Sequence, residues 1–123
     1  MLQPSVPAWF EIPARDMDRA VRFYEAVLEA SLERETAGAM EMAVFPHQKP
    51  GASGAVVRAK GYEPAEAGSV VYLNLDDIRP ALERVPRAGG TVLLPRTALP
   101  DEIGFFAQIR DSEGNRVGLF SRG

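Results

Sequence analysis

The chain of 123 residues contains no cysteine and only one histidine. The absence of cysteine excludes disulfide bonds, thiolate nucleophiles and cysteine-ligated metal sites. The single histidine, His47, stands among prolines and glycine in a stretch typical of a loop. We predict that His47 is a solvated loop residue and neither a ligand nor a base, because both roles usually need an orienting partner.

The chain also lacks long apolar runs and an excess of positive charge. No run approaches the roughly 20 apolar residues that span a bilayer, and the first residues do not resemble a signal peptide. The net charge is −3, with acidic and basic residues interleaved, so there is no basic stripe for a phosphate backbone. We therefore expect a cytoplasmic protein that binds neither nucleic acid nor a membrane.

A strand-helix pattern occurs twice. Residues 9–28 return in altered form as residues 70–88, each with apolar positions spaced by three and four in its second part. Asp16 precedes the first helix, and Asp76 or Asp77 precedes the second. Such carboxylates cap helices by accepting hydrogen bonds from the free N–H groups of the first turn. The chain therefore contains two copies of one unit.

Short β-rich runs account for most of the remaining chain. Pro86 falls in the last turn of the second helix, where we expect fraying or a kink. Residues 46–54 and 60–68 are rich in glycine, proline and alanine and are predicted loops, and residues 111–114 form a tight, mainly structural turn. The predicted strands are residues 6–12, 40–45, 55–59, 69–75, 91–94, 105–110 and 116–120.

This order of elements predicts an α+β fold in which two small mixed or antiparallel sheets carry helices on their outer faces and enclose an open cavity. A chain of this length forms one domain, 1–123, with a first module at about 6–59, a linker at about 60–68 and a second module at about 69–121. Half-open sheets leave edges uncovered, so we expect a homodimer.

Three segments carry a family resemblance: IPARDMDRAVRFYEAVL at residues 12–28, the glycine pair at 89–90, and DSEGNRVGL at residues 111–119. Together they resemble the vicinal oxygen chelate superfamily, which includes glyoxalase I, extradiol dioxygenases, fosfomycin resistance enzymes and bleomycin-binding proteins. The resemblance implies two βαβββ modules. It does not specify an activity, because one fold hosts many chemistries.

Metal-dependent members of this superfamily carry ligands at four strand positions, which the resemblance places at Trp9, Arg58, Val70 and Gly118. None of these side chains donates a lone pair to a divalent cation. The resemblance is therefore to a branch that lacks the metal ligands, and we expect no cofactor. The alternative is a shifted register that brings Glu11 and Glu41 inward, a carboxylate pair better suited to magnesium than to zinc or nickel.

Alternation along the strands predicts which side chains face the cavity. If Trp9 faces it, so does Glu11, and the same alternation groups Val56 with Arg58, Val70 with Tyr72, and Gly118 with Phe120. We expect Glu11 and Arg58 to pair or to hold polar ends of a ligand between aromatic walls. The predicted ligand-binding residues are Trp9, Glu11, Arg58, Val70, Tyr72, Gly118 and Phe120, with Glu11 as the candidate catalytic residue.

Three classes of function fit these residues. The first is metal-independent binding of a small apolar or aromatic molecule. The second is an enzyme, a lyase, an isomerase or epimerase, or dioxygenase-like, with Glu11 as general base and Tyr72 or Arg58 as electrophile. The third is a structural domain whose cavity is filled by Trp9, Val70 and Phe120, with an exposed apolar patch around residues 105–106.

Overall fold

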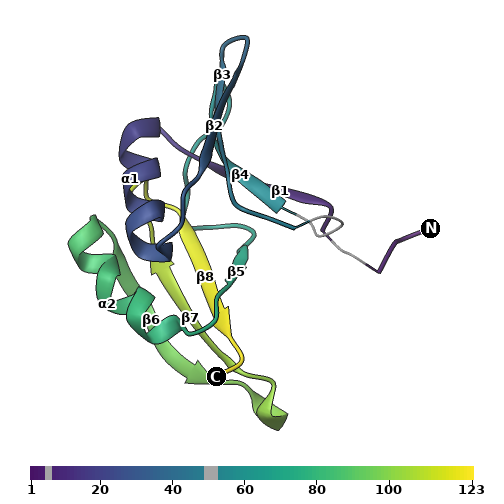
Figure 1. Cartoon of the computed structure of the whole chain (residues 1–123), viewed down its shortest axis with the longest axis vertical. Helices are drawn as coiled ribbons and strands as arrows, with labels where there is room; N and C mark the ends of the chain where they lie inside the picture. Colours follow the sequence, from purple (N-terminus) through teal and green to yellow (C-terminus); the bar gives the residue numbers. More distant parts are fainter. Residues whose placement is uncertain (5–6, 49–52) are drawn as a thin grey trace.

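The computed structural model describes residues 1–4, 7–48 and 53–123. The first half of the chain forms one helix and one four-stranded sheet (Figure 1). In this sheet, with strand order β1-β4-β3-β2, β1 is parallel to β4 and the other neighbours are antiparallel. Its elements are β1 (Trp9–Pro13), α1 (Met17–Leu28), β2 (Glu33–Ala37), β3 (Met40–Val44) and β4 (Ser53–Arg58).

The second half repeats this plan, with strand order β5-β8-β7-β6 and β5 parallel to β8. The predicted α+β fold of two βαβββ units with open sheets is confirmed. The elements are β5 (Tyr72–Asn74), α2 (Ile78–Ala88), β6 (Thr91–Ala98), a short 3-10 helix (Pro100–Glu102), β7 (Phe105–Arg110) and β8 (Arg116–Ser121).

Aspartates cap both helices, as the sequence predicts. The Asp16 carboxylate accepts a hydrogen bond from the N–H of Arg19 at 3.0 Å, and Asp77, not Asp76, caps α2 by accepting from the N–H of Arg79 at 3.0 Å. The proline in the last turn does not shorten α2, which continues through Pro86 to Ala88. The two capped helices therefore begin at equivalent points of the repeat.

The two helices lie side by side on one side of both sheets (Figure 1). Phe23 and Tyr24 of α1, Ile78 and Val85 of α2, and Leu119 of β8 are almost fully buried in one continuous core. Helices thus cover one face of each sheet, and within residues 1–4, 7–48 and 53–123 no α-helix lies on the opposite faces. No helix in the described part of the chain is long and apolar enough to cross a membrane.

The strand predictions differ from the structure in three places. Strand β2 was not predicted because its segment, Glu33–Ala37, is charged and exposed along its whole length, as edge strands often are. Strand β5 is shorter than predicted and β6 extends further, to Ala98. Parts of the predicted strand at 6–12 and of the predicted loop at 46–54 lie outside the described residues.

Candidate functional site

Strand β1 sends alternate side chains to opposite faces of its sheet. Ile12 is buried in the core, whereas Trp9 and Glu11 lie on the face without a helix. The indole Nε1 of Trp9 donates a hydrogen bond to Oε2 of Glu11 at 3.3 Å. Trp9 keeps 42% of its surface exposed, so it does not fill a closed core, and the filled-cavity interpretation is wrong at this position.

Glu11 has a second hydrogen-bond donor that the sequence does not predict. The hydroxyl of Tyr62, in the segment that connects the modules, donates to Oε1 of Glu11 at 2.8 Å, and this hydrogen bond raises the pKa of Tyr62. This contact could not be predicted because residues 60–68 were predicted to be a loop. Loop residues have no periodicity from which the direction of a side chain can be inferred. Glu11 is therefore an exposed carboxylate held by two neutral donors.

Arg58 does not join Glu11. Its guanidinium contacts the Glu41 carboxylate at 2.8 Å and donates to the backbone oxygen of Arg15 at 3.3 Å. Arg58 shares its sheet face with Val56, which is buried in the core beneath the helices. The predicted pairing of Glu11 with Arg58 is wrong, because the alternation that places Glu11 on the open face places Arg58 on the other one. Glu41, directly opposite Arg58, lies on that same face.

The open face of the second sheet brings together Tyr72, Gly118 and Phe120. Tyr72 lies opposite Gly118 across the parallel pair, and its ring covers the place that a Cβ at Gly118 would occupy. The rings of Tyr72 and Phe106 are 6.2 Å apart, and Gln108 donates to the Tyr72 hydroxyl at 2.7 Å. Val70 precedes β5 by two residues and is half-buried.

Among the described residues, two cavities lie between the modules. The larger has a volume of about 490 Å³ and is lined chiefly by aromatic and aliphatic side chains, with Ser53, Asn74 and Asp76 as its polar groups. Phe10 and Phe45 stack in its wall with ring centroids 5.7 Å apart. Of the predicted site residues, only Tyr72 lines this cavity. The apolar lining residues are Phe10, Leu28, Ala30, Phe45, Pro46, Tyr72, Leu73 and Leu75.

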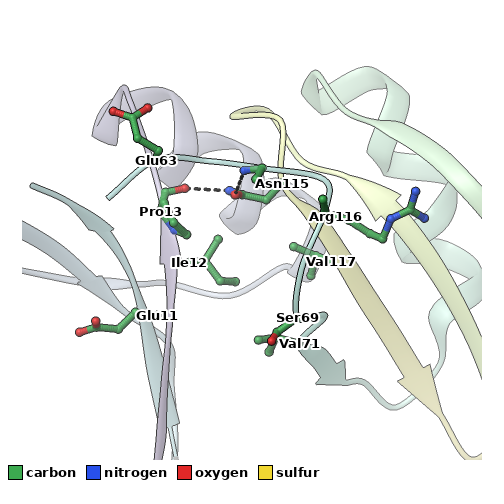
Figure 2. Close-up of a pocket in the computed structure, with 11 residues that line it drawn as sticks. Glu11, Ile12, Pro13, Glu63, Ser69, Val71, Asn115, Arg116 and Val117 are labelled. Atoms are coloured by element: carbon green, nitrogen blue, oxygen red, sulfur yellow. Dashed lines mark hydrogen bonds between the residues drawn. The ribbon is translucent and has the colours of Figure 1, made fainter. Parts of the chain in front are cut away.

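The smaller cavity has a volume of about 170 Å³ and is more polar. Figure 2 shows it between β1, the connecting segment and the start of β8, with Glu11 and Arg116 pointing away from one another. The Asn115 side chain reaches from the second module to the first and donates to the backbone oxygen of Pro13 at 2.7 Å (Figure 2). The smaller cavity is therefore bounded by contacts that hold the modules together.

The turn between β7 and β8 contains two buried carboxylates. Oδ1 of Asp111 accepts from the N–H groups of residues 113–115, all at 2.9 Å, as expected for a turn in which aspartate binds its own backbone. Its Oδ2 also accepts a hydrogen bond from the Tyr24 hydroxyl at 2.5 Å. Burial raises the pKa of Tyr24 well above its usual value, and the Asp111 charge adds to this effect.

Glu113 connects the same turn to the start of α1. Its side chain is fully buried and accepts from the N–H groups of Arg15 at 2.8 Å and Asp16 at 2.9 Å, and from Nε of Arg19 at 2.7 Å. Burial alone would raise the pKa of Glu113, but these donors and the Ser112 hydroxyl outweigh it and hold the pKa at about 2. The sequence predicts only the turn and gives no signal for this contact between modules.

The residues at the family's metal positions do not fit a divalent metal ion. The Trp9 indole donates its N–H to Glu11, the Arg58 guanidinium is cationic and bound to Glu41, and Val70 and Gly118 have no donor atom. Nor does the shifted register unite Glu11 with Glu41, since they lie on opposite faces. Among the described residues, no group of three or more His, Asp or Glu side chains is placed to hold a metal.

Comparison with known proteins defines the family. The model of the Glyoxalase/Bleomycin resistance protein/Dioxygenase superfamily matches residues 7–119. The chain belongs to this superfamily. A glyoxylase-like domain-containing protein from Didymella fabae is 29% identical over 115 residues, which cover 91% of this chain and 90% of the relative.

Solved structures share the fold at lower identity. TnmS3, an antibiotic binding protein from Streptomyces sp. CB03234, matches over 98% of both chains with a TM-score of 0.70 and 19% identity. Glyoxalase I from Zea mays matches 94% of this chain with a TM-score of 0.68 and 20% identity. This chain spans only 45% of the maize enzyme. At these identities the likeness establishes the fold alone.

Proposed function

We propose that this protein binds a small apolar or aromatic molecule in the larger cavity between its modules, without a metal ion. The volume and lining of this cavity carry the proposal. Ligand pockets of proteins typically measure about 300–1,000 Å³ and are mostly apolar with a few polar groups. The larger cavity, at about 490 Å³, lies within that range, whereas the smaller one, at about 170 Å³, does not.

The lining indicates the class of ligand. Phe10, Phe45 and Tyr72 offer aromatic surface. Burial of a flat apolar molecule against them is favourable by about 25 cal/mol per Å² of apolar surface removed from water. Asn74 and Ser53 supply hydrogen-bonding groups that orient such a body. TnmS3, which shares the fold over its whole length, is an antibiotic binding protein. That relative supports binding, rather than turnover, as the activity to test first.

Metal independence is part of the proposal. The side chains at the four positions where metal-dependent relatives place ligands support it. These side chains are those of Trp9, Arg58, Val70 and Gly118, and none of them is a metal ligand. The relevant test is a thermal-shift screen of chelator-treated protein against neutral aromatic compounds, repeated with divalent ions. A ligand present at 100 times its Kd stabilises the native state by about 2.7 kcal/mol, which raises Tm by several degrees.

A cavity-filling variant makes the screen specific. Ala30 lines the larger cavity, so Ala30→Trp is expected to abolish the Tm rise caused by an organic ligand. Ala26→Trp is the matched control, because Ala26 is exposed on α1 and does not line the cavity. An undiminished response in Ala30→Trp would contradict the proposed site, and a response that requires a divalent ion would contradict metal independence.

A second candidate function is general-base catalysis by Glu11. The observation that favours it is the 2.8 Å hydrogen bond from Tyr62, which places a proton-bearing phenol beside the carboxylate. The expected signature is exchange of a carbon-bound proton with solvent deuterium, followed by NMR over a panel of carbon acids. Exchange that is lost in Glu11→Gln would establish the base, and the absence of exchange with native protein would exclude this candidate for the panel.

The predicted homodimer also belongs to this proposal. Trp9 and Tyr72 expose 42% and 44% of their surfaces on faces that carry no helix, and a second copy is the partner expected to cover them. Phe105, in the apolar patch considered from sequence, is half-buried against the core and lies under the Arg96 guanidinium. Sedimentation analysis of the native protein and of Trp9→Glu tests the dimer. The cytoplasmic location stays a prediction.

A further inference from the structure

Two arginines stand directly opposite one another on the second sheet. Arg110, at the end of β7, pairs in register with Arg116, at the start of β8. Like charges at directly opposed strand positions destabilise a sheet unless a counterion joins them. The two side chains are 41% and 32% exposed, so solvent screens their repulsion only in part. This arrangement points to a shared anion.

The counterion comes from within the chain. Oε1 of Glu66 accepts a hydrogen bond from Nε of Arg110, and Oε2 of Glu66 lies 4.0 Å from Nη2 of Arg116. Arg116 also donates through Nη1 to Oε1 of Gln108 at 2.8 Å, and Gln108 in turn donates to the Tyr72 hydroxyl. One carboxylate therefore faces two guanidinium groups, which leaves one positive charge without an equal partner in this cluster.

Glu66 belongs to the connecting segment and not to the sheet. The segment is fixed one residue earlier, where the N–H of Ala65 donates to Oδ1 of Asn115 at 3.1 Å and its carbonyl accepts from the N–H of Arg116 at 3.3 Å. Gly68, two residues later, has a φ of 102°, a conformation that favours glycine. The Glu66 carboxylate is 39% exposed, so a side-chain rotation releases it while the backbone stays anchored at Ala65.

We propose that Arg110 and Arg116 form a binding subsite for the carboxylate of a small molecule, and that Glu66 occupies this subsite when no ligand is bound. A pair of guanidinium groups matches the two oxygens of a carboxylate, and charge-assisted hydrogen bonds of this kind are about twice as strong as neutral ones. Tyr72 and Phe106 provide ring surface on the same sheet face. An aryl carboxylate therefore fits the site.

This subsite goes beyond the proposed binding of an apolar molecule and does not rest on it. Arg110 and Arg116 do not line the larger cavity. If neutral compounds did not bind in the larger cavity, the proposal for the arginine pair would still stand. If an anion did not bind the arginines, the proposal for the larger cavity would still stand. Benzoate and its neutral counterpart benzamide separate the two sites.

The experiment titrates benzoate into native protein, Glu66→Gln and Glu63→Gln by NMR, following the Nε–H signals of Arg110 and Arg116. Glu63→Gln is the matched control, because Glu63 lies on the same segment and pairs with the exposed Arg15 instead. Removing the internal competitor is expected to tighten benzoate binding at least about tenfold in Glu66→Gln and to leave Glu63→Gln like native protein. Benzamide is expected to shift neither arginine signal.

Adding Arg110→Gln to Glu66→Gln is expected to remove most of the gained affinity for benzoate. Circular dichroism of each variant verifies the fold. If Glu66→Gln does not fold, native protein and Arg110→Gln at high benzoate concentration give the test, since only the native protein is expected to show shifts at Arg116. Equal benzoate affinity in native protein and a folded Glu66→Gln, or shifts at Arg116 that persist without Arg110, would overturn the proposal.

Discussion

Glu11 and Glu113 are both held by hydrogen bonds, yet their surroundings differ in every other respect. Glu113 is fully buried and accepts from two backbone N–H groups and the Arg19 guanidinium. Glu11 is exposed and accepts from two neutral side chains, Trp9 and Tyr62. The first arrangement uses a carboxylate to join two modules, and the second leaves a carboxylate accessible to a ligand or solvent.

Glu113 therefore has a structural role, whereas Glu11 is free to interact with a ligand. A buried carboxylate is costly unless donors surround it, and Glu113 has a full set of donors. An exposed carboxylate with two donors retains acceptor capacity, because each oxygen offers two lone pairs. Residue type and strand alternation assigned the functional role to Glu11, and the structure adds that Glu113, whose pKa is held at about 2, joins the two modules.

Substitution of Glu113 is expected to have the largest effect. Glu113→Gln places an amide where a carboxylate meets the Arg19 guanidinium, and so lowers the free energy of unfolding by about 3 kcal/mol. Urea denaturation measures this change. Glu41→Gln, which breaks the half-exposed pair with Arg58, is the control and is expected to cost at most about 1 kcal/mol. Equal costs for the two variants would contradict the structural role of Glu113.

Acid is expected to weaken the same contact. The pKa of Glu113 is about 2 in the folded protein against a usual value of 4.5. A lowered pKa stabilises the native state above pH 4.5, and this contribution, about 3 kcal/mol, is lost as the pH falls towards 2. Unfolding curves between pH 5 and pH 2 measure it, with native protein expected to lose more stability than Glu113→Gln. Parallel losses would contradict the assignment.

Removing the Tyr24 hydroxyl is expected to have a smaller effect. Tyr24→Phe deletes the 2.5 Å hydrogen bond to Asp111, but Oδ2 of Asp111 still accepts from Asn115 at 3.0 Å. The expected cost is about 1–2 kcal/mol, measured by urea denaturation. Tyr62→Phe is the matched control, because its hydroxyl contacts the exposed Glu11, and an equal or larger cost in the control would contradict this ranking.

Glu11→Gln is expected to change stability least, within about 0.5 kcal/mol, since Glu11 is exposed and bound only to neutral donors. Binding of a neutral aromatic ligand in the larger cavity is expected to persist in this variant, because Glu11 does not line that cavity. A thermal-shift titration measures both quantities. A large loss of stability in Glu11→Gln would remove the distinction between Glu11 and Glu113.

The fold was predictable because local signals repeat. Capping aspartates and helical spacing at α1 and α2 mark the start of each helix. Alternation groups Trp9 with Glu11 on one face of β1, but Trp9 lines neither cavity, and Glu11 and Tyr72 line different ones. The contacts of Glu113 and Glu11 were less predictable because their partners are distant in sequence. Glu113 and Arg19 are 94 positions apart, and Tyr62 and Glu11 are 51 apart, separations on which periodicity carries no information.

Arg58 shows a different limit. Its assignment to the cavity depended on a register carried over from other proteins, and a shift of one residue moves a strand side chain to the opposite face. Val56 and Arg58 both lie on the helix-covered side, where the arginine meets Glu41. A pairing register between β3 and β4 was needed to decide this, and turn lengths in the sequence did not provide one.

The most direct test of the central claim is methyl NMR of chelator-treated protein, titrated with the neutral aromatic compound that raises Tm most. The account predicts shifts at the methyl groups of Leu28, Leu73 and Leu75, which line the larger cavity, with no divalent ion added. Shifts confined to other methyl groups, or binding that begins only when nickel, zinc or manganese is added, would contradict a metal-free ligand site between the modules.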